Sequence, residues 1–491
     1  MKRSLMCAAL ALAAAATPAA AQAPAGPEPQ WDVVLTRDLL AMRAAIDEGH
    51  PGPVDELNPS FKLALEEGLK RAMERAPTAN SAGGWWWALR EYAAIFDDGH
   101  LSVGMLEKAP PLTYRWPGFL TRFEGRDQII AVRLEQAGLP ELGAKLISCD
   151  GHSAWRLAEE HVGRFHGRWQ LEAQRARQGA RLFLDASNPW IKQPQSCVFE
   201  HDGRSVTYRL DWRDLSGDEA GQRLTEAQRS FRAPIERRAL AGGGAWISAG
   251  SFDGNPASDA GKALRAVVEG MKADQAALRA APVVVLDLRG NGGGSSAWSR
   301  EMAVVLWGED YVAAREPGSD YVDWRVAEAN IATIRGFGEA LRQDPQANPE
   351  WLKWVEEVVA GMEAARAAGR PLWRQGEGTD DAPSAGAAAA PQFAGRAYVL
   401  TDAACASACL DAVDLWKALG AVQVGGETSA DTLYMEIREQ PLPSEMAVLR
   451  LPMKVYRGRP RGLNEPHRPE HLWSGNMADT AGIEAWIAGL R

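Results

Sequence analysis

The chain has 491 residues, of which 46% are hydrophobic and 24% charged, and its formal net charge is −10. This length exceeds that of one ordinary domain, and the composition is typical of a soluble globular protein, so we expect about two to four domains. An acidic chain without a long basic run does not favour nucleic-acid binding, and we expect no nucleic-acid partner.

The first residues have the pattern of a secretory signal peptide. Lys2 and Arg3 precede a short apolar run, and small residues before Ala21 favour cleavage after residue 21, which gives a signal peptide over 1–21. That run is too short to span a membrane, and no later stretch qualifies. The sequence therefore predicts a periplasmic or secreted protein without a membrane span.

Cysteine usage agrees with export. Of the five cysteines, all except Cys7 lie beyond residue 21. An oxidising compartment permits two disulfides, Cys149 with Cys197 and Cys405 with Cys409. A CxxxC spacing without clustered histidines does not indicate zinc, and we expect neither a metal nor a cofactor.

The first half of the chain contains two segments of different character. Residues 22–110 begin with a Pro/Ala-rich stretch, continue with apolar residues at helical spacing, and end in Asp98-Gly99-His100 and a short strand, which predicts a helical N-terminal domain. Residues 111–222 alternate like strands around tight turns, and their order suggests a compact β-rich module with a PDZ-like layout.

Residues 223–480 read as an α/β domain, so the fold class is α/β within a multi-domain α+β chain. The apolar run from Pro282 to Leu288 predicts a strand buried on both faces, and a Gly-rich turn and a helix follow it. Residues 309–394 interrupt this pattern with a helix at 351–362 and a loose Ala/Pro/Gly stretch at 382–391, which we interpret as an inserted helical cap. Residues 481–491 are expected to form a C-terminal helix.

Two turns in this α/β domain contain residues that are candidates for a catalytic role. Between a strand at 397–400 and a helix ending near Gly420, Ser407 is placed either as an exposed nucleophile or as a simple helix N-cap. The turn at 290–294 has glycines that let backbone N–H groups point into a site, or that merely allow strand–helix packing. Neither nucleotide-binding fingerprint is present.

Taken together, the stretch Leu286–Gly294 and the later stretch Val399–Ala408 resemble the motifs of the S41 family of serine peptidases, which includes C-terminal (tail-specific) processing proteases and the tricorn core protease. The resemblance covers about 225–475, and more loosely the two segments before it. It implies Ser407 as the nucleophile, and an oxyanion hole formed by the backbone N–H groups near Gly292 and of Ala408.

The resemblance also bears on the general base. The processing proteases use a lysine beyond the serine, but no lysine lies between Lys417 and Lys454. The tricorn-like branch uses a histidine from an N-terminal segment and a later glutamate, which implies His100 and Glu465. His467, Glu470, His471, Glu427 and Glu436 compete for these roles, and the second Asp-Gly-His, at 150–152, receives no catalytic role.

The sequence therefore predicts an exported serine peptidase that acts on a peptide or protein substrate, with a Ser407–His100–Glu465 triad. For this triad to form, the helical N-terminal segment must fold back onto the α/β domain. The alternatives are a non-catalytic binding protein with the same fold and an esterase with the same triad. The sequence does not indicate an oligomeric state.

Overall fold

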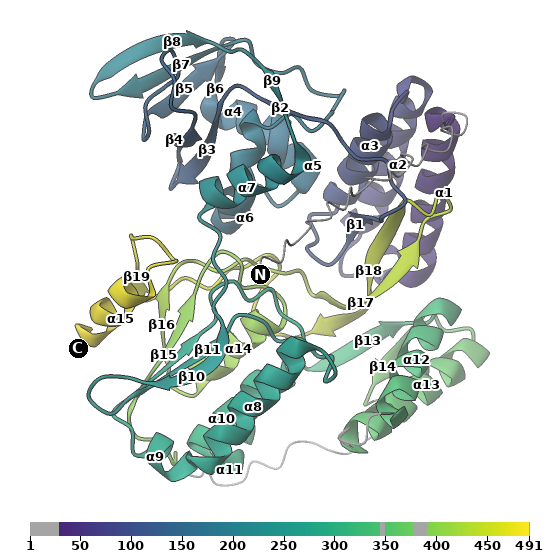
Figure 1. The fold of residues 1–491 in the computed structure, drawn as a ribbon. Coiled ribbons are helices and arrows are strands. Elements are labelled where there is room, and N and C mark those ends of the chain that lie inside the picture. Colours follow the sequence, from purple (N-terminus) through teal and green to yellow (C-terminus); the bar gives the residue numbers. More distant parts are fainter. Residues whose placement is uncertain (1–28, 344–348, 377–389, 491) are drawn as a thin grey trace, which may run out of the picture.

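The computed structural model of the chain describes residues 29–343, 349–376 and 390–490. The expected signal peptide lies outside these ranges, as does most of the stretch 382–391. Figure 1 shows the N-terminal helices at the right, a β-rich module at the top, the α/β sheet at the lower left and the insertion at the lower right.

Three helices form the N-terminal segment, as the helical spacing predicts. They are α1 (Trp31–Gly49), α2 (Ser60–Arg75) and α3 (Ala82–Ala94), and the Ser81 side chain caps α3 by accepting the N–H of Gly84. The fully buried face of α1 contains Leu35, Leu39 and Ile46, which recur at helical spacing.

The β-rich module contains a sheet in the order β3-β4-β5-β7-β8, with β6 on β5, and a separate β2–β9 pair. Its helices pack on this sheet, and Phe119, Phe183 and Phe199 lie at the centre of its core. Its strands are β2 (Tyr114–Trp116), β3 (Phe119–Glu124), β4 (Asp127–Arg133), β5 (Lys145–Cys149), β6 (His152–Ser153), β7 (Ser196–His201), β8 (Arg204–Arg209) and β9 (Arg213–Leu215). Its helices are α4 (Ala154–Ala158), α5 (Arg164–His166), α6 (Glu172–Gln178) and α7 (Gly217–Gln228).

The α/β domain is built on a sheet in the order β10-β11-β12-β15-β16-β19, in which only β10 is antiparallel. Helices α8, α10 and α14 cover one face and α15 covers the other, so the central strands are apolar on both faces. The strands are β10 (Ile235–Ala239), β11 (Ala245–Ala249), β12 (Val283–Asp287), β15 (Arg396–Thr401), β16 (Val422–Gly425) and β19 (His471–Leu472). The helices are α8 (Asp259–Ala273), α9 (Gln275–Arg279), α10 (Ala297–Trp307), α11 (Glu309–Ala313), α14 (Ala408–Ala418) and α15 (Thr480–Ala488).

A second sheet joins distant parts of the chain. Its longest strand, β18 (Ala447–Arg457), pairs with β17 (Tyr434–Pro441) along one edge, and with β1 (Ser102–Met105) and β13 (Tyr321–Arg325) along the other. Helices α1 to α3 share one core with β17 and β18 (Figure 1). The N-terminal segment therefore folds back onto the α/β domain, as the predicted triad requires.

The insertion contains strands as well as the predicted helix. Residues 351–362 lie within α13 (Pro349–Ala367), which packs with α12 (Glu328–Gln343). Strands β13 and β14 (Leu372–Gln375) pair with each other, and β13 extends the sheet through β18. The pattern of the insertion alone did not indicate these strands, because their partner lies about 130 residues further along the chain.

Both expected disulfides are present, Cys149–Cys197 between β5 and β7 and Cys405–Cys409 around the start of α14. Within the described ranges, no helix combines the length and the apolar character needed to cross a bilayer.

A buried ion pair fastens the N-terminal segment to the second sheet. The Arg457 guanidinium donates to both carboxylate oxygens of Asp55, at 2.8 and 3.2 Å, and the Tyr434 hydroxyl donates to the same carboxylate at 2.7 Å. All three residues are buried. Asp323 also pairs with Arg457, at 3.4 Å, so removal of Asp55 would leave this buried guanidinium with only its longer ion pair, and the cluster contributes to the stability of the interface.

We therefore expect Asp55→Asn to lower the free energy of unfolding by about 3 kcal/mol, measured by urea denaturation. The matched control is Asp47→Asn, which removes a solvent-exposed ion pair with Arg43 and should cost less than about 1 kcal/mol. Equal effects of the two substitutions would contradict the importance of the buried cluster.

Candidate active site

Ser407 lies at a sharp turn between β15 and α14. Its backbone has φ 56° and ψ −127°, a positive φ that is uncommon for a residue with a side chain. Its N–H donates to the Asp431 carboxylate at 2.7 Å, and the Cys405–Cys409 disulfide spans the turn. A strained turn that presents a serine at a helix N-terminus is the geometry of a nucleophile elbow.

The Gly-rich turn after β12 is held in a fixed shape. The N–H of Gly290 donates to both carboxylate oxygens of buried Asp402, at 3.1 and 3.0 Å. Asn291 donates from its amide to the carbonyl of Ala249, and its amide oxygen accepts the N–H of Gly293. These hydrogen bonds fix the conformation of the turn around Gly292.

This turn lies directly against the nucleophile elbow. A Cβ atom on Gly293 would be only 2.6 Å from Cβ of Ser407 and 3.0 Å from the backbone nitrogen of Ala408. Since Gly293 also has φ 102°, a glycine is needed here for both space and conformation.

Two backbone donors at this contact have no acceptor. Among the described residues, no hydrogen bond uses the N–H of Gly292 or that of Ala408. The N–H of Ser407 itself is engaged by Asp431. The predicted pair of oxyanion donors, Gly292 and Ala408, is therefore free to bind a ligand oxygen.

The loop that contains His100 is connected to the elbow through Asp431. The carbonyl of Asp431 accepts the N–H of Asn464 at 2.8 Å, and the Asn464 amide donates to the carbonyl of Asp97 at 2.9 Å. Nearby, the Arg168 guanidinium donates to the carbonyl of Ala430. The segment before β1 and the elbow are thus parts of one hydrogen-bonded assembly.

His100 faces the carboxylate of Asp98. The Asp98 Oδ1 atom accepts the N–H of His100 at 2.8 Å and lies 4.0 Å from its Nδ1, while the side chain of His100 is 11% exposed. Oδ2 of Asp98 lies 3.7 Å from Nε2 of His50, whose Nδ1 accepts the N–H of Gly52. A buried carboxylate therefore lies between two imidazoles.

The charges in this group follow from its burial. Burial lowers the pKa of His50, so this histidine is neutral with its proton on Nε2, facing Asp98. Burial alone would raise the pKa of Asp98, but its contacts with His50 and His100 outweigh that effect and the pKa lies below its usual value. Asp98 is therefore ionised and able to stabilise a positive charge on His100.

The predicted triad is not closed by hydrogen bonds. Within the described ranges, no hydrogen bond joins Ser407 to His100 or His100 to Glu465. Glu465 is exposed, and its carboxylate accepts the N–H of Gly462 at 2.9 Å. The roles of Ser407, His100 and Glu465 stay predictions.

The competing residues are engaged elsewhere. Glu427, Glu436 and Glu470 pair with Arg468, Lys454 and Lys417, and Nε2 of His467 lies 2.8 Å from Asp414, while His471 lies exposed in β19. Burial would lower the pKa of Lys454, but Glu436 and Tyr456 outweigh that effect and raise it. A lysine that stays protonated is not a general base.

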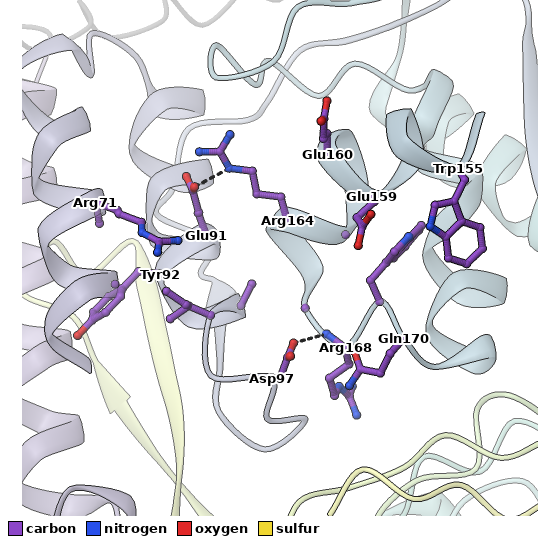
Figure 2. A pocket seen from close by; sticks show the side chains of 17 residues that line it. Arg71, Glu91, Tyr92, Asp97, Trp155, Glu159, Glu160, Arg164, Arg168 and Gln170 are labelled. Atoms are coloured by element: carbon purple, nitrogen blue, oxygen red, sulfur yellow. Dashed lines mark hydrogen bonds and ion pairs between the residues drawn. The ribbon is translucent and has the colours of Figure 1, made fainter. Parts of the chain in front are cut away.

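Two cavities flank the His100 loop. One of about 800 Å³ lies between α2 and α3 on one side and the helices of the β-rich module on the other. In Figure 2, Glu91 and Arg164 point toward each other across it, and Asp97 and Arg168 lie at its lower end. A smaller cavity of about 150 Å³ is lined by Asp97, Asp98 and Gly99 of the loop itself.

The sequence did not indicate Asp431, Asp402 or Asn464. Each acts on a backbone group far away in the chain, and although Asp402 lies in the stretch Val399–Ala408, its spacing there does not reveal its partner Gly290. For Asp98, the Asp-Gly-His spacing was a signal, because an Asp two residues before a histidine readily accepts that residue's N–H.

The fold is similar to two solved structures, mature CPAF complexed with lactacystin and mature CPAF alone. Each has a TM-score of 0.57 and 12% sequence identity, and each match covers 94% of this chain and 99% or 98% of the CPAF chain. At this identity the likeness concerns the fold. A comparison with curated protein sequences gave no match.

The sequence of the α/β domain gives a more specific result than the comparison of folds, because it matches a family. Residues 245–461 match the family described as Peptidase family S41, and this range contains the Gly-rich turn, the insertion and the Ser407 elbow. The α/β domain of this chain is therefore similar in sequence to peptidase family S41.

Proposed function

We propose that this protein is an exported serine peptidase with Ser407 as its nucleophile. The observation that supports this most directly is the contact between the Gly-rich turn and the Ser407 elbow, which leaves two backbone donors free beside the serine. The S41 family match over the same residues supports hydrolysis of a peptide bond. The N-terminal pattern and the two disulfides support export.

In the proposed reaction, Oγ of Ser407 attacks the carbonyl carbon of the scissile bond while its proton passes to His100. The oxyanion that forms accepts hydrogen bonds from the N–H groups of Gly292 and Ala408. His100 then gives the proton to the leaving amine, and an acyl-enzyme remains on Ser407. Water, deprotonated by His100, hydrolyses that ester and releases the serine.

Two carboxylates are candidates for the residue that orients His100. The family resemblance favours Glu465, whereas the distances favour Asp98, which is buried and lies 4.0 Å from Nδ1 of His100. Either carboxylate would fix the tautomer that leaves Nε2 free for Ser407 and would stabilise the imidazolium.

A non-catalytic binding protein and an esterase with the same triad are the alternatives. A binding protein would use the two free N–H donors to bind a ligand oxygen without reaction at Ser407, so covalent labelling of Ser407 separates it from an enzyme. An esterase would use every catalytic group in the same way, so only a comparison of peptide and ester substrates separates it from a peptidase.

Labelling with a fluorophosphonate probe tests the nucleophile. We expect the wild-type protein to be labelled and to hydrolyse a mixture of unstructured peptides, and Ser407→Ala to do neither. Because the side chain of Ser407 makes no structural hydrogen bond among the described residues, the variant should keep the thermal stability of the wild type. Labelling that persists in Ser407→Ala would exclude this residue as the nucleophile, and absent labelling of the wild type would favour the binding protein.

The orienting carboxylate is tested by Asp98→Asn and Glu465→Gln. The variant that loses the true partner of His100 should lose about 10²–10⁴ in kcat, because the tautomer is no longer fixed. The other variant should lose less than about tenfold. The pH dependence of kcat/KM and the melting temperature, measured for both variants, separate a catalytic loss from a loss of structure. Equal and small losses would show that neither carboxylate orients His100.

The contact between turn and elbow is tested by Gly293→Ala. The added methyl group would meet Ser407 and force the two apart, so we expect a loss of about 10²–10³ in kcat with the fold retained by circular dichroism. The control is Gly254→Ala, because a Cβ there has its nearest neighbour at 3.6 Å, an ordinary contact distance. Full activity in Gly293→Ala would show that the close contact between the Gly-rich turn and the Ser407 elbow is not required for catalysis.

A further inference from the structure

The smaller cavity beside the His100 loop is rich in arginine. Its lining combines the start of β1 with residues of α3, α5 and α6, and it includes Arg90, Arg168 and Arg177. Residues Asp97 to Gly99 of the His100 loop form another part of its wall. Whatever occupies this cavity would therefore lie next to the predicted general base.

These guanidinium groups have no carboxylate partners. Arg90 donates to the carbonyl of Phe165 and to Nδ1 of His166, and Arg168 donates to the carbonyl of Ala430. The exposed Arg177 side chain makes no hydrogen bond or ion pair within the described ranges. Arg90 and Arg168 are thus bound by neutral acceptors, and Arg177 interacts with the Asp402 carboxylate only electrostatically, without an ion-pair contact.

The pKa of Arg90 shows that its positive charge is unfavourable in this arrangement. Burial, together with the nearby charge of Arg181, lowers the pKa of Arg90 to about 10. His166 does not add to the charge, because burial lowers its pKa well below the usual value. An anion that enters this cavity would relieve the repulsion among the guanidinium groups.

The two acidic residues in the wall do not supply that anion. The Asp98 carboxylate lies against His50 and His100, and the Asp97 carboxylate accepts the backbone N–H of Arg168 at 2.5 Å. By contrast, the lining of the larger cavity contains more acidic than basic residues, and Glu91 pairs there with Arg164 at 2.6 Å (Figure 2). Only the smaller of these two cavities has unbalanced positive charge.

We propose that the smaller cavity is a subsite for a carboxylate of the bound peptide, held by Arg90, Arg168 and Arg177. The proposal rests on the proposed peptidase function, because it assigns the carboxylate to the substrate. A volume of about 150 Å³ accommodates one carboxylate with its adjoining methylene groups rather than a long segment of chain. The carboxylate comes either from an acidic side chain or from the C-terminus, and both present the planar oxygen pair that guanidinium groups bind.

The test measures binding to the full-length Ser407→Ala protein, so that no hydrolysis intervenes. Three fluorescent acetylated pentaalanine probes are compared: one with a central Glu and an amidated end, one with Gln in its place, and one with a free C-terminal carboxylate. We expect one of the two anionic probes to bind about tenfold more tightly than the neutral probe, and this preference to weaken with salt. The probe that is preferred identifies the source of the carboxylate.

Arg177→Gln, added to the same protein, should abolish this preference. The matched control is Arg204→Gln, which removes the same charge from an exposed position on β8 of the same module and should leave the preference unchanged. Equal binding of all three probes, or equal effects of the two arginine substitutions, would overturn the proposal. A carboxylate preference in a protein without Ser407-dependent labelling would keep the subsite and reject the peptidase function, so the two failures are distinguishable.

Discussion

Asp431 connects the two halves of the predicted site. Its carboxylate accepts the N–H of Ser407, and its carbonyl accepts the N–H of Asn464, which in turn reaches the carbonyl of Asp97. A non-glycine residue at positive φ costs about 1–3 kcal/mol. A hydrogen bond to a charged acceptor contributes about 1.5–3 kcal/mol, so this single bond can offset the strain at Ser407. The same residue therefore holds the elbow in shape and places the His100 loop beside it.

The position of that loop depends also on strand pairing. β1 begins two residues after His100, and its register on β18 aligns Ser102 with Arg450 and Val103 with Leu449. A slip of one residue would exchange the buried and exposed sides of β1 and would rotate the loop away from the elbow. The fully buried Leu449 and Leu451 and the helices packed on them make such a slip costly. The N-terminal helices thus fix the predicted site from outside the residues that match family S41.

The local pattern of the chain predicted much of this structure. Apolar spacing indicated α1 to α3, the run at 282–288 indicated β12, and the two disulfides join the cysteine pairs that the sequence made plausible. What could not be predicted are contacts between residues that are far apart in the sequence. β13 has its partner in β18, and Asp431 binds Ser407 over 24 residues, and neither residue type nor spacing records these pairings. The predicted contact of Glu465 with His100 also joins residues far apart in the sequence, because it depends on the path of the loop that contains Glu465.

The loop that contains Glu465 follows β18, and its anchoring affects which carboxylate acts on His100. Among the described residues Glu465 makes no hydrogen bond to His100, and its segment is held in place by Arg459 and Arg461, which pair with Asp411 on α14. Arg461 also pairs with Asp414, and the side chain of Arg461 is only 5% exposed. Breaking a buried ion pair costs about 3–5 kcal/mol. Asp98 needs only to close from 4.0 Å to a hydrogen-bond distance of about 2.8 Å, a change of about 1 Å that side-chain rotation supplies. Asp98 is therefore the carboxylate that already lies against His100.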